Sequence, residues 1–127
     1  MTGIVTTTFD EQFGKKLWDE LRESREFRAQ GMFWLLEDDW HLVIASPIVD
    51  QLGPRDAYRK LAEVARFLPN ESGQLLRIEL ISPRNPLYQA FQTVFSHTPA
   101  DRVEGRRLTA SQVAGMYIQD AYFYGVR

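Results

Sequence analysis

The feature that most constrains this fold is a pair of places where an apolar, strand-like run passes directly into an amphipathic helix. The first junction spans residues 45–55 and the second spans 81–86. Pro54 and Asn85 suit the first turn and the cap of a helix, respectively. The stretch 40–81 has the length of a strand–helix–strand unit. If its two strands run parallel in one sheet, the crossover should be right-handed.

Two hairpins are predicted on either side of this unit. Apolar runs at 32–36 and 40–45 flank the polar turn 37–39. Both runs are apolar on both faces, as strands at the centre of a covered sheet are, and we expect the first two helices to cover them. Towards the C-terminus, 107–110 and 116–124 read as strands around a turn at 111–115.

The last strand has a period-two pattern. Its two predicted faces are Met116, Ile118, Asp120, Tyr122 and Tyr124 on one side, and Tyr117, Gln119, Ala121 and Phe123 on the other.

The first helix is predicted from a capping box at 8–11, with Gly31 as its C-terminal stop. Gly14 inside it should cost about 1 kcal/mol relative to alanine. We interpret its charged side as a solvated face held by i,i+4 pairs, the alternative being a charged docking surface. That side carries Lys15, Lys16, Asp19, Glu20, Arg22, Glu23, Arg25, Glu26 and Arg28.

Two further helices and one strand complete the pattern. A helix that opens at Gly53-Pro54 should end at Pro69, and a strand should follow at 75–81. Asn85-Pro86 should start the third helix. The 127 residues, 44% of them hydrophobic, suit one domain with a real core. We therefore predict a single α+β (or α/β) domain over 1–127, with a mixed sheet of about five strands, three helices and the order α-β-β-α-β-α-β-β.

Three segments resemble a set of small uncharacterised bacterial α+β proteins. They are 40–58, the Ile-Ser-Pro-Arg-Asn-Pro-Leu run at 81–87, and the Tyr-Ile-Gln-Asp-Ala-Tyr-Phe-Tyr run at 117–124. The resemblance covers roughly 33–124. It implies a bacterial or mobile-element context and brings no activity and no functional residue with it.

The sequence offers no catalytic or metal-binding pattern, so we predict no catalytic residue, no metal and no cofactor. His41 and His97 are the only histidines, and no HExxH-type spacing exists. We interpret His41 as structural and His97 as a loop residue. Ser46 lacks the G-x-S-x-G elbow of a hydrolase. An acid-x-Lys nuclease pattern is also missing, because no lysine follows position 60.

A small anionic ligand is one functional possibility. If the two junctions open on the same sheet edge, Arg55, Arg84 and Asp50 would line one crevice there. Free N–H groups at helix starts attract anions. The plainer alternative is that Arg55 pairs with a neighbouring acid and Arg84 stays exposed.

The leading hypothesis is non-enzymatic binding of a protein partner, or self-association as a homo-oligomer. Tyr117, Tyr122 and Tyr124 lie in one terminal strand, and tyrosine is common at interfaces. We expect an edge position for this strand, which would let it pair with another chain. The net charge of −2 argues against nucleic acid. Without a signal peptide, a long apolar run or cysteine, the expected location is the cytoplasm, with no membrane contact.

Overall fold

The strands form one mixed sheet. In the computed structural model, which describes residues 9–68 and 77–127, five strands lie in the order β3-β2-β1-β5-β4. They are β1 (Gly31–Glu37), β2 (Asp39–Ala45), β3 (Ile78–Ile81), β4 (Arg107–Val113) and β5 (Met116–Val126). β2 and β3 are parallel, and the other pairs are antiparallel. The mixed sheet and the predicted order of the elements are confirmed.

Four α-helices pack on this sheet within the described residues: α1 (Glu11–Glu23), α2 (Ile48–Leu52), α3 (Pro54–Ala65) and α4 (Pro86–Val94). A short 3₁₀ helix, η2 (Ala100–Arg102), precedes β4. The short α2 was not predicted, because its five residues precede Gly53 in what reads as a loop. None of the helices in the described segments combines the length and apolar character needed to cross a membrane.

The caps explain where the helices begin. The side chain of Asp10 accepts a hydrogen bond from the Phe13 N–H at 2.9 Å, so α1 starts at Glu11. Thr8, where the predicted capping box begins, lies outside the described residues. Asn85 caps α4 in the same way through the Leu87 N–H, as predicted. Pro69 and residues 75–76 of the predicted third strand lie outside the described residues.

Gly31 is not the stop of the first helix. It begins β1, while α1 already ends at Glu23 with Ser24 as its cap. A side chain at position 31 would meet the Tyr88 ring at 2.6 Å and the backbone oxygen of Gly125 at 2.8 Å. The glycine is therefore explained by close packing of β1 against β5 and α4, and not by helix termination.

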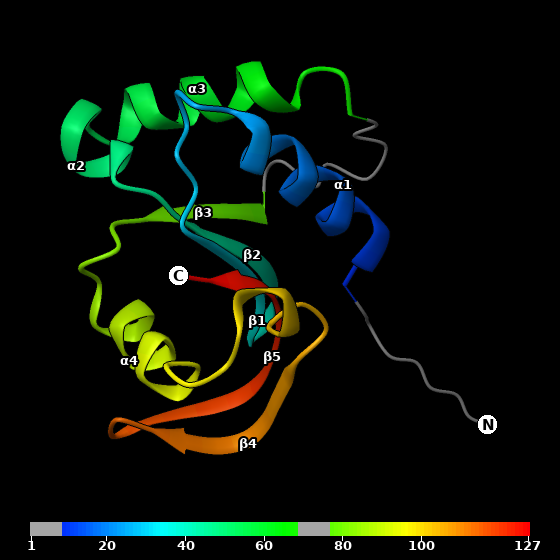
Figure 1. The fold of residues 1–127 in the computed structure, drawn as a ribbon, viewed down its shortest axis with the longest axis vertical. Coiled ribbons are helices and arrows are strands. Elements are labelled where there is room, and N and C mark those ends of the chain that lie inside the picture. Colours follow the sequence, from blue (N-terminus) through cyan, green and yellow to red (C-terminus); the bar gives the residue numbers. More distant parts are fainter. Residues whose placement is uncertain (1–8, 69–76) are drawn as a thin grey trace.

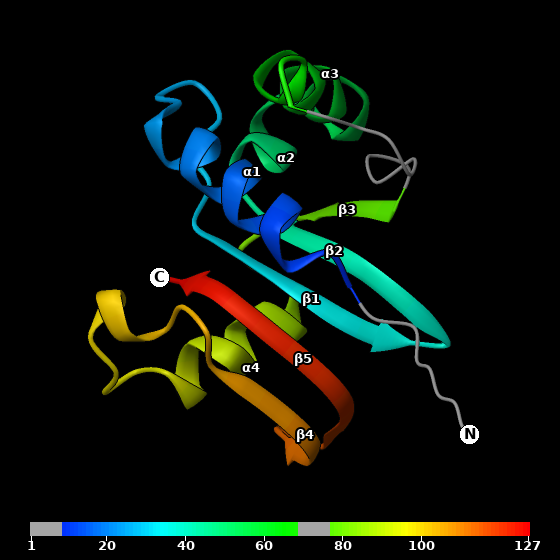
Figure 2. The same cartoon turned by 90° about the vertical axis from the view of Figure 1, so that its right-hand side faces the viewer.

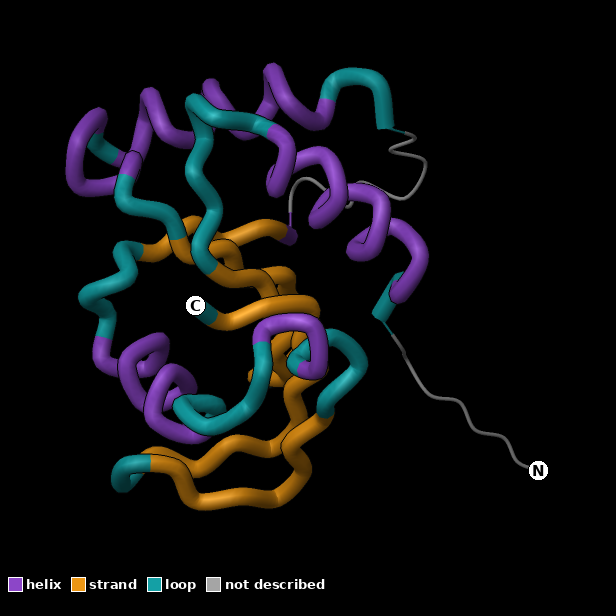
Figure 3. Tube along the Cα trace, viewed as in Figure 1, coloured by secondary structure: helices purple, strands orange, loops and turns teal. Residues whose placement is uncertain are grey.

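The sheet separates two apolar cores. On one face α1 and α3 lie together, and α4 covers the other face (Figures 1 and 2). The first two predicted helices, which became α1 and α3, thus cover the central strands from the same face. Alternation along β1 sends Met32 and Trp34 into the first core and Phe33 and Leu35 into the second. The tube drawing shows α4 beside the β4–β5 hairpin (Figure 3), and residues of both contribute to the second core.

β5 departs from its predicted pattern in two ways. It lies between β1 and β4 and is not an edge strand. Ile118 also packs into the second core with Ala121 and Phe123, whereas Tyr124 belongs to the first. The register with β1 shifts where Met32 faces Gly125 and Phe33 faces Phe123. Beyond this shift Val126 lies in the second core although Tyr124 lies in the first, so the two-residue alternation is interrupted there.

One bidentate ion pair ties β4 to β5. The Arg107 guanidinium donates to both carboxylate oxygens of Asp120, at 2.9 and 2.8 Å. This hydrogen bonding holds the pKa of Asp120 below its usual value, even though partial burial opposes the shift. Asp120, the acidic residue of β5, thus helps to hold the β4–β5 hairpin together.

Candidate functional site

The junction residues predicted to bind a ligand lie partly together. Arg84 Nη2 is 3.7 Å from an Asp50 carboxylate oxygen, and the Ser82 hydroxyl donates to the other oxygen of Asp50 at 2.7 Å. The parallel pairing of β2 and β3 brings these groups to one edge of the sheet. No ion pair or hydrogen bond among the described residues joins Arg55 to either of them. Asp50 also neutralises Arg84, whose side chain is 82% exposed.

A stronger basic hollow lies elsewhere, beyond the C-terminal end of α1. Four arginines line a hollow of about 320 Å³: Arg22, Arg25, Arg28 and Arg127. Its other walls are Leu21, Ser24, Ala29, Gln30 and Pro47. We refer to this hollow as the arginine pocket.

A tight turn after α1 positions two of these arginines. The Ser24 hydroxyl accepts from the Phe27 N–H at 3.2 Å, and the Arg28 N–H donates to the Ser24 carbonyl at 3.3 Å. The Phe27 side chain is fully buried in the first core. Arg28 then takes a left-handed backbone conformation with φ of 57°, an unusual one for a residue with a side chain. The turn leaves Arg25 and Arg28 exposed while their neighbour Phe27 is buried.

Arg127, which follows β5, joins the arginine pocket from a distant part of the sequence. Its N–H lies 3.1 Å from the Gln30 carbonyl and 3.0 Å from the Tyr88 hydroxyl. The Tyr88 hydroxyl and the Gln92 amide both donate to the Arg127 carbonyl. Burial raises the pKa of Tyr88 to about 12, so this hydroxyl stays protonated at neutral pH. The backbone of Arg127 is therefore held by Gln30 on one side and by Tyr88 and Gln92 of α4 on the other.

The charged side chains that line the arginine pocket are all positive. Among the described residues, its lining includes no aspartate or glutamate. Arg22 pairs with Asp19 at 2.8 Å, whereas Arg25, Arg28 and Arg127 form no ion pair with any acid in the described parts of the chain. The helix dipole favours a cation in the last turn of α1, where Arg22 lies. Arg25 and Arg28 follow the helix, so the dipole does not account for them.

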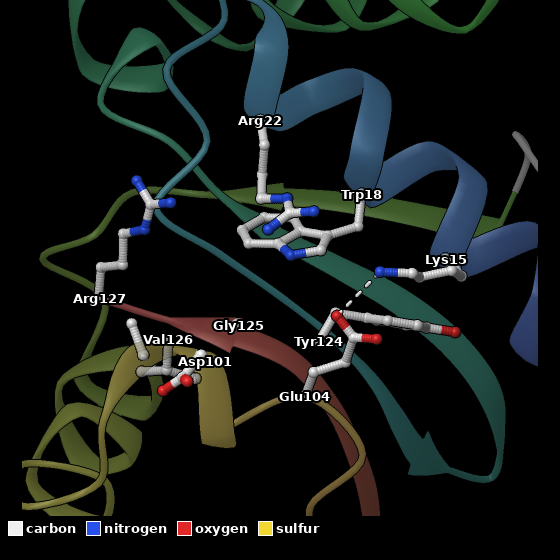
Figure 4. A pocket seen from close by; sticks show the side chains of 10 residues that line it. Lys15, Trp18, Arg22, Asp101, Glu104, Tyr124, Gly125, Val126 and Arg127 are labelled. Atoms are coloured by element: carbon white, nitrogen blue, oxygen red, sulfur yellow. Dashed lines mark hydrogen bonds and ion pairs between the residues drawn. The ribbon is translucent and has the colours of Figure 1, made fainter.

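A second hollow adjoins the arginine pocket and shares Arg22 and Arg127 with it. It measures about 410 Å³ and lies between α1, η2 and the end of β5 (Figure 4). We refer to it as the tryptophan pocket, after Trp18. Its lining residues are Lys15, Trp18, Arg22, Ala100, Asp101, Glu104, Tyr124, Gly125, Val126 and Arg127.

One wall of the tryptophan pocket is fixed by an ion pair between distant segments. Lys15 Nζ is 3.0 Å from Glu104 and 3.2 Å from Asp19. The hydrogen bond with Glu104 contributes most to raising the pKa of Lys15. Asp101, in η2, forms no ion pair among the described residues. Glu104 is thus neutralised, whereas the carboxylate of Asp101 is available.

A third hollow surrounds His41, which the sequence analysis interpreted as structural. His41 Nε2 is 3.5 Å from a Glu37 oxygen and 3.4 Å from a Glu79 oxygen, and the lining also includes Asp38 and Arg77. No group of three or more histidine, cysteine or acidic side chains in the described segments is arranged to hold a metal. His97 lies exposed in the turn after α4. Among the residues that the structure describes, the lining of this hollow gives His41 two carboxylate partners and no nucleophile.

The three tyrosines predicted at an interface have different surroundings. Tyr117 is 61% exposed, Tyr122 is half-buried and Tyr124 is only 2% exposed. The Tyr124 hydroxyl accepts from the Trp34 indole N–H at 3.1 Å and donates to the Glu11 carbonyl at 2.8 Å. Tyr124 therefore holds α1 on the sheet and cannot contact a partner in this fold.

Sequence reasoning missed the arginine pocket. It treated Arg22, Arg25 and Arg28 as parts of one solvated helix face. The available signal was the three-residue spacing of these arginines across Ser24, a residue that favours helix ends over helix interiors. Nothing in the local sequence places Arg127 beside them.

Comparison with known protein families, with curated proteins and with solved structures finds no match to this chain. The fold and the two adjoining pockets define it as a small α+β protein with a concave basic site. The chemistry of that site is therefore the guide to its function.

Proposed function

We propose that this protein binds a small anionic ligand in the arginine pocket. The observation that carries the proposal is the gathering of four arginines around one hollow whose described lining includes no aspartate or glutamate. Like charges held together repel one another. An anion seated among them would relieve that repulsion and stabilise the folded protein by mass action.

The donor chemistry favours an oxyanion such as a phosphate or a carboxylate. A guanidinium group presents planar pairs of N–H donors that match two oxygens of such a group. The turn that carries Arg25 and Arg28 is fixed by Ser24 and by the burial of Phe27. The backbone of this turn therefore needs little reordering when the ligand arrives, and preorganisation of this kind favours affinity.

The test compares two double variants by calorimetry and thermal shift with inorganic phosphate and citrate. In Arg25→Ala/Arg28→Gly we expect affinity to fall by at least about tenfold, since a hydrogen bond to a charged group contributes about 1.5–3 kcal/mol. Glycine tolerates the left-handed backbone at position 28 without strain, so the fold should survive. In the matched control Arg55→Ala/Arg84→Ala, binding should be unchanged.

The control variant also tests whether the anion binds at the strand-to-helix junctions instead. Loss of binding only in Arg55→Ala/Arg84→Ala would move the anion site to the junctions around Asp50. No stabilisation of the wild-type protein by either anion would contradict the proposal altogether.

A second candidate function is self-association through the open edge of the sheet. At the β3 edge, the Tyr58 hydroxyl of α3 accepts from the Leu80 N–H at 3.0 Å and so covers part of that edge. At the opposite edge, β4 pairs only with β5 among the described strands. Residues 108–112 of β4 are uncharged, so a second copy could pair there without charge repulsion. The exposed Tyr117 lies opposite Gln112 and would join this interface.

Light scattering over a range of concentrations tests this candidate. If β4 pairs with a second copy, the wild-type protein forms a dimer, and Thr109→Lys/Gln112→Lys becomes a folded monomer because edge lysines oppose strand pairing. Gln51→Lys, on exposed α2, should leave the dimer intact. A wild-type monomer at every concentration would exclude pairing at β4.

The net charge of −2 argues against nucleic acid as a partner. The cysteine-free sequence suits a reducing compartment, and we propose the cytoplasm as the location.

A further inference from the structure

We propose that the ligand is a small zwitterion, with its anionic group in the arginine pocket and an ammonium group beside Asp101 in the tryptophan pocket. This inference rests on the proposed anion site and deepens it. Arg22 and Arg127 line both pockets, so the two hollows meet at these side chains. Figure 4 shows Arg22 over Trp18, Arg127 extending from the end of β5, and Asp101 on η2 around the tryptophan pocket.

The two pockets differ in the sign of the charge that they add to the shared arginines. The arginine pocket adds Arg25 and Arg28 and no acid from the described residues. The tryptophan pocket adds Lys15, Asp101 and Glu104, which together carry a net charge of −1. Because Glu104 is already paired with Lys15 at 3.0 Å, Asp101 is the carboxylate left to attract a cationic group of the ligand.

This arrangement separates a zwitterion from other anionic ligands. A simple ion such as phosphate would fill only the arginine pocket and gain nothing from Asp101. An extended polyanion that continued into the tryptophan pocket would meet the carboxylate of Asp101, which disfavours it by like-charge repulsion. A ligand with opposite charges at its two ends matches both pockets.

The boundary between the two pockets is built on the buried ring of Trp18. Trp18 is 2% exposed and packs against Gly125, where any side chain would collide with the indole ring. The Arg22 guanidinium lies 5.9 Å from the centre of that ring. The floor of the tryptophan pocket is thus rigid, and it places Arg22 at the boundary between the two pockets.

Titration calorimetry with a matched pair of probes tests the inference. Phosphoethanolamine and ethyl phosphate share the phosphate group, and only the first carries an ammonium. We expect wild-type protein to bind phosphoethanolamine about fivefold more tightly, the equivalent of one exposed ion pair. Asp101→Asn should abolish this preference and bind ethyl phosphate at least as tightly as the wild type does. Arg25→Ala/Arg28→Gly should lower the affinity of the protein for both probes.

The outcomes separate this inference from the proposed function. Equal binding of the two probes by wild-type protein, or an unchanged preference in Asp101→Asn, overturns the zwitterion and leaves the anion site standing. Failure of both probes to bind overturns the anion site as well. Asp101 is exposed, so the variant should fold, and its melting temperature verifies this.

Discussion

Gly14→Ala is expected to destabilise the protein by about 1–3 kcal/mol, the usual penalty for adding a methyl group to a filled core. Helix propensity alone predicts the opposite, a gain of about 1 kcal/mol. The difference arises because a side chain at position 14 would collide with the hydroxyl and ring of Tyr124. Tyr124 cannot easily move, since its hydroxyl accepts a hydrogen bond from the Trp34 indole and donates one to the Glu11 carbonyl. Thermal or urea unfolding monitored by circular dichroism measures the effect.

A double-mutant cycle assigns the loss to that collision. Tyr124→Phe removes the atom nearest to position 14, so Gly14→Ala should cost less in this background than in the wild type. Gln12→Ala, at an exposed position of α1, serves as the control and should change stability little. A Gly14→Ala protein as stable as the wild type would show that α1 packs differently from this description.

Ser46→Ala is expected to destabilise the protein by about 1–3 kcal/mol, because it leaves a buried carbonyl without its hydrogen-bond donor. Ser46 is fully buried. Its hydroxyl donates to the Phe27 carbonyl and accepts from the Ile48 N–H at 3.2 Å. It therefore links the turn that carries Arg25 and Arg28 to the start of α2. We expect phosphate affinity to fall along with the melting temperature.

The second junction offers a matched control in Ser82→Ala. Ser82 also follows a strand and precedes a proline, and its hydroxyl accepts from the Arg84 N–H at 3.0 Å. Its hydrogen bonds are exposed to water, so the loss should be a fraction of that in Ser46→Ala. Equal effects of the two substitutions would contradict a special role for Ser46 in fixing the arginine turn.

The parts of the fold that were predicted correctly depend on residues close together in the sequence. Pro54 and the Asn85 cap mark helix starts through backbone chemistry that depends on few neighbours. The apolar runs that became β1 and β2 are buried on both faces, as their composition indicated. Their pairing across the turn at Asp38 was predicted as well.

The errors concern residues whose surroundings come from distant parts of the chain. Gly14 and Gly31 look like a weak point and a stop in a helix, but both make room for tyrosines from other elements. The place of β5 inside the sheet depends on its pairing with β1, which no local pattern specifies. The arginine pocket likewise requires Arg127 to meet the turn after α1, so the sequence could not reveal it.

The central claim, an anion site made by four arginines, is tested most directly by NMR of the arginine side chains during a phosphate titration. We predict that the Nε–Hε signals of Arg22, Arg25, Arg28 and Arg127 shift together along one saturable binding curve, while those of Arg55 and Arg84 stay in place. Shifts confined to Arg55 and Arg84, or uniform small shifts of all arginines without saturation, would contradict the claim.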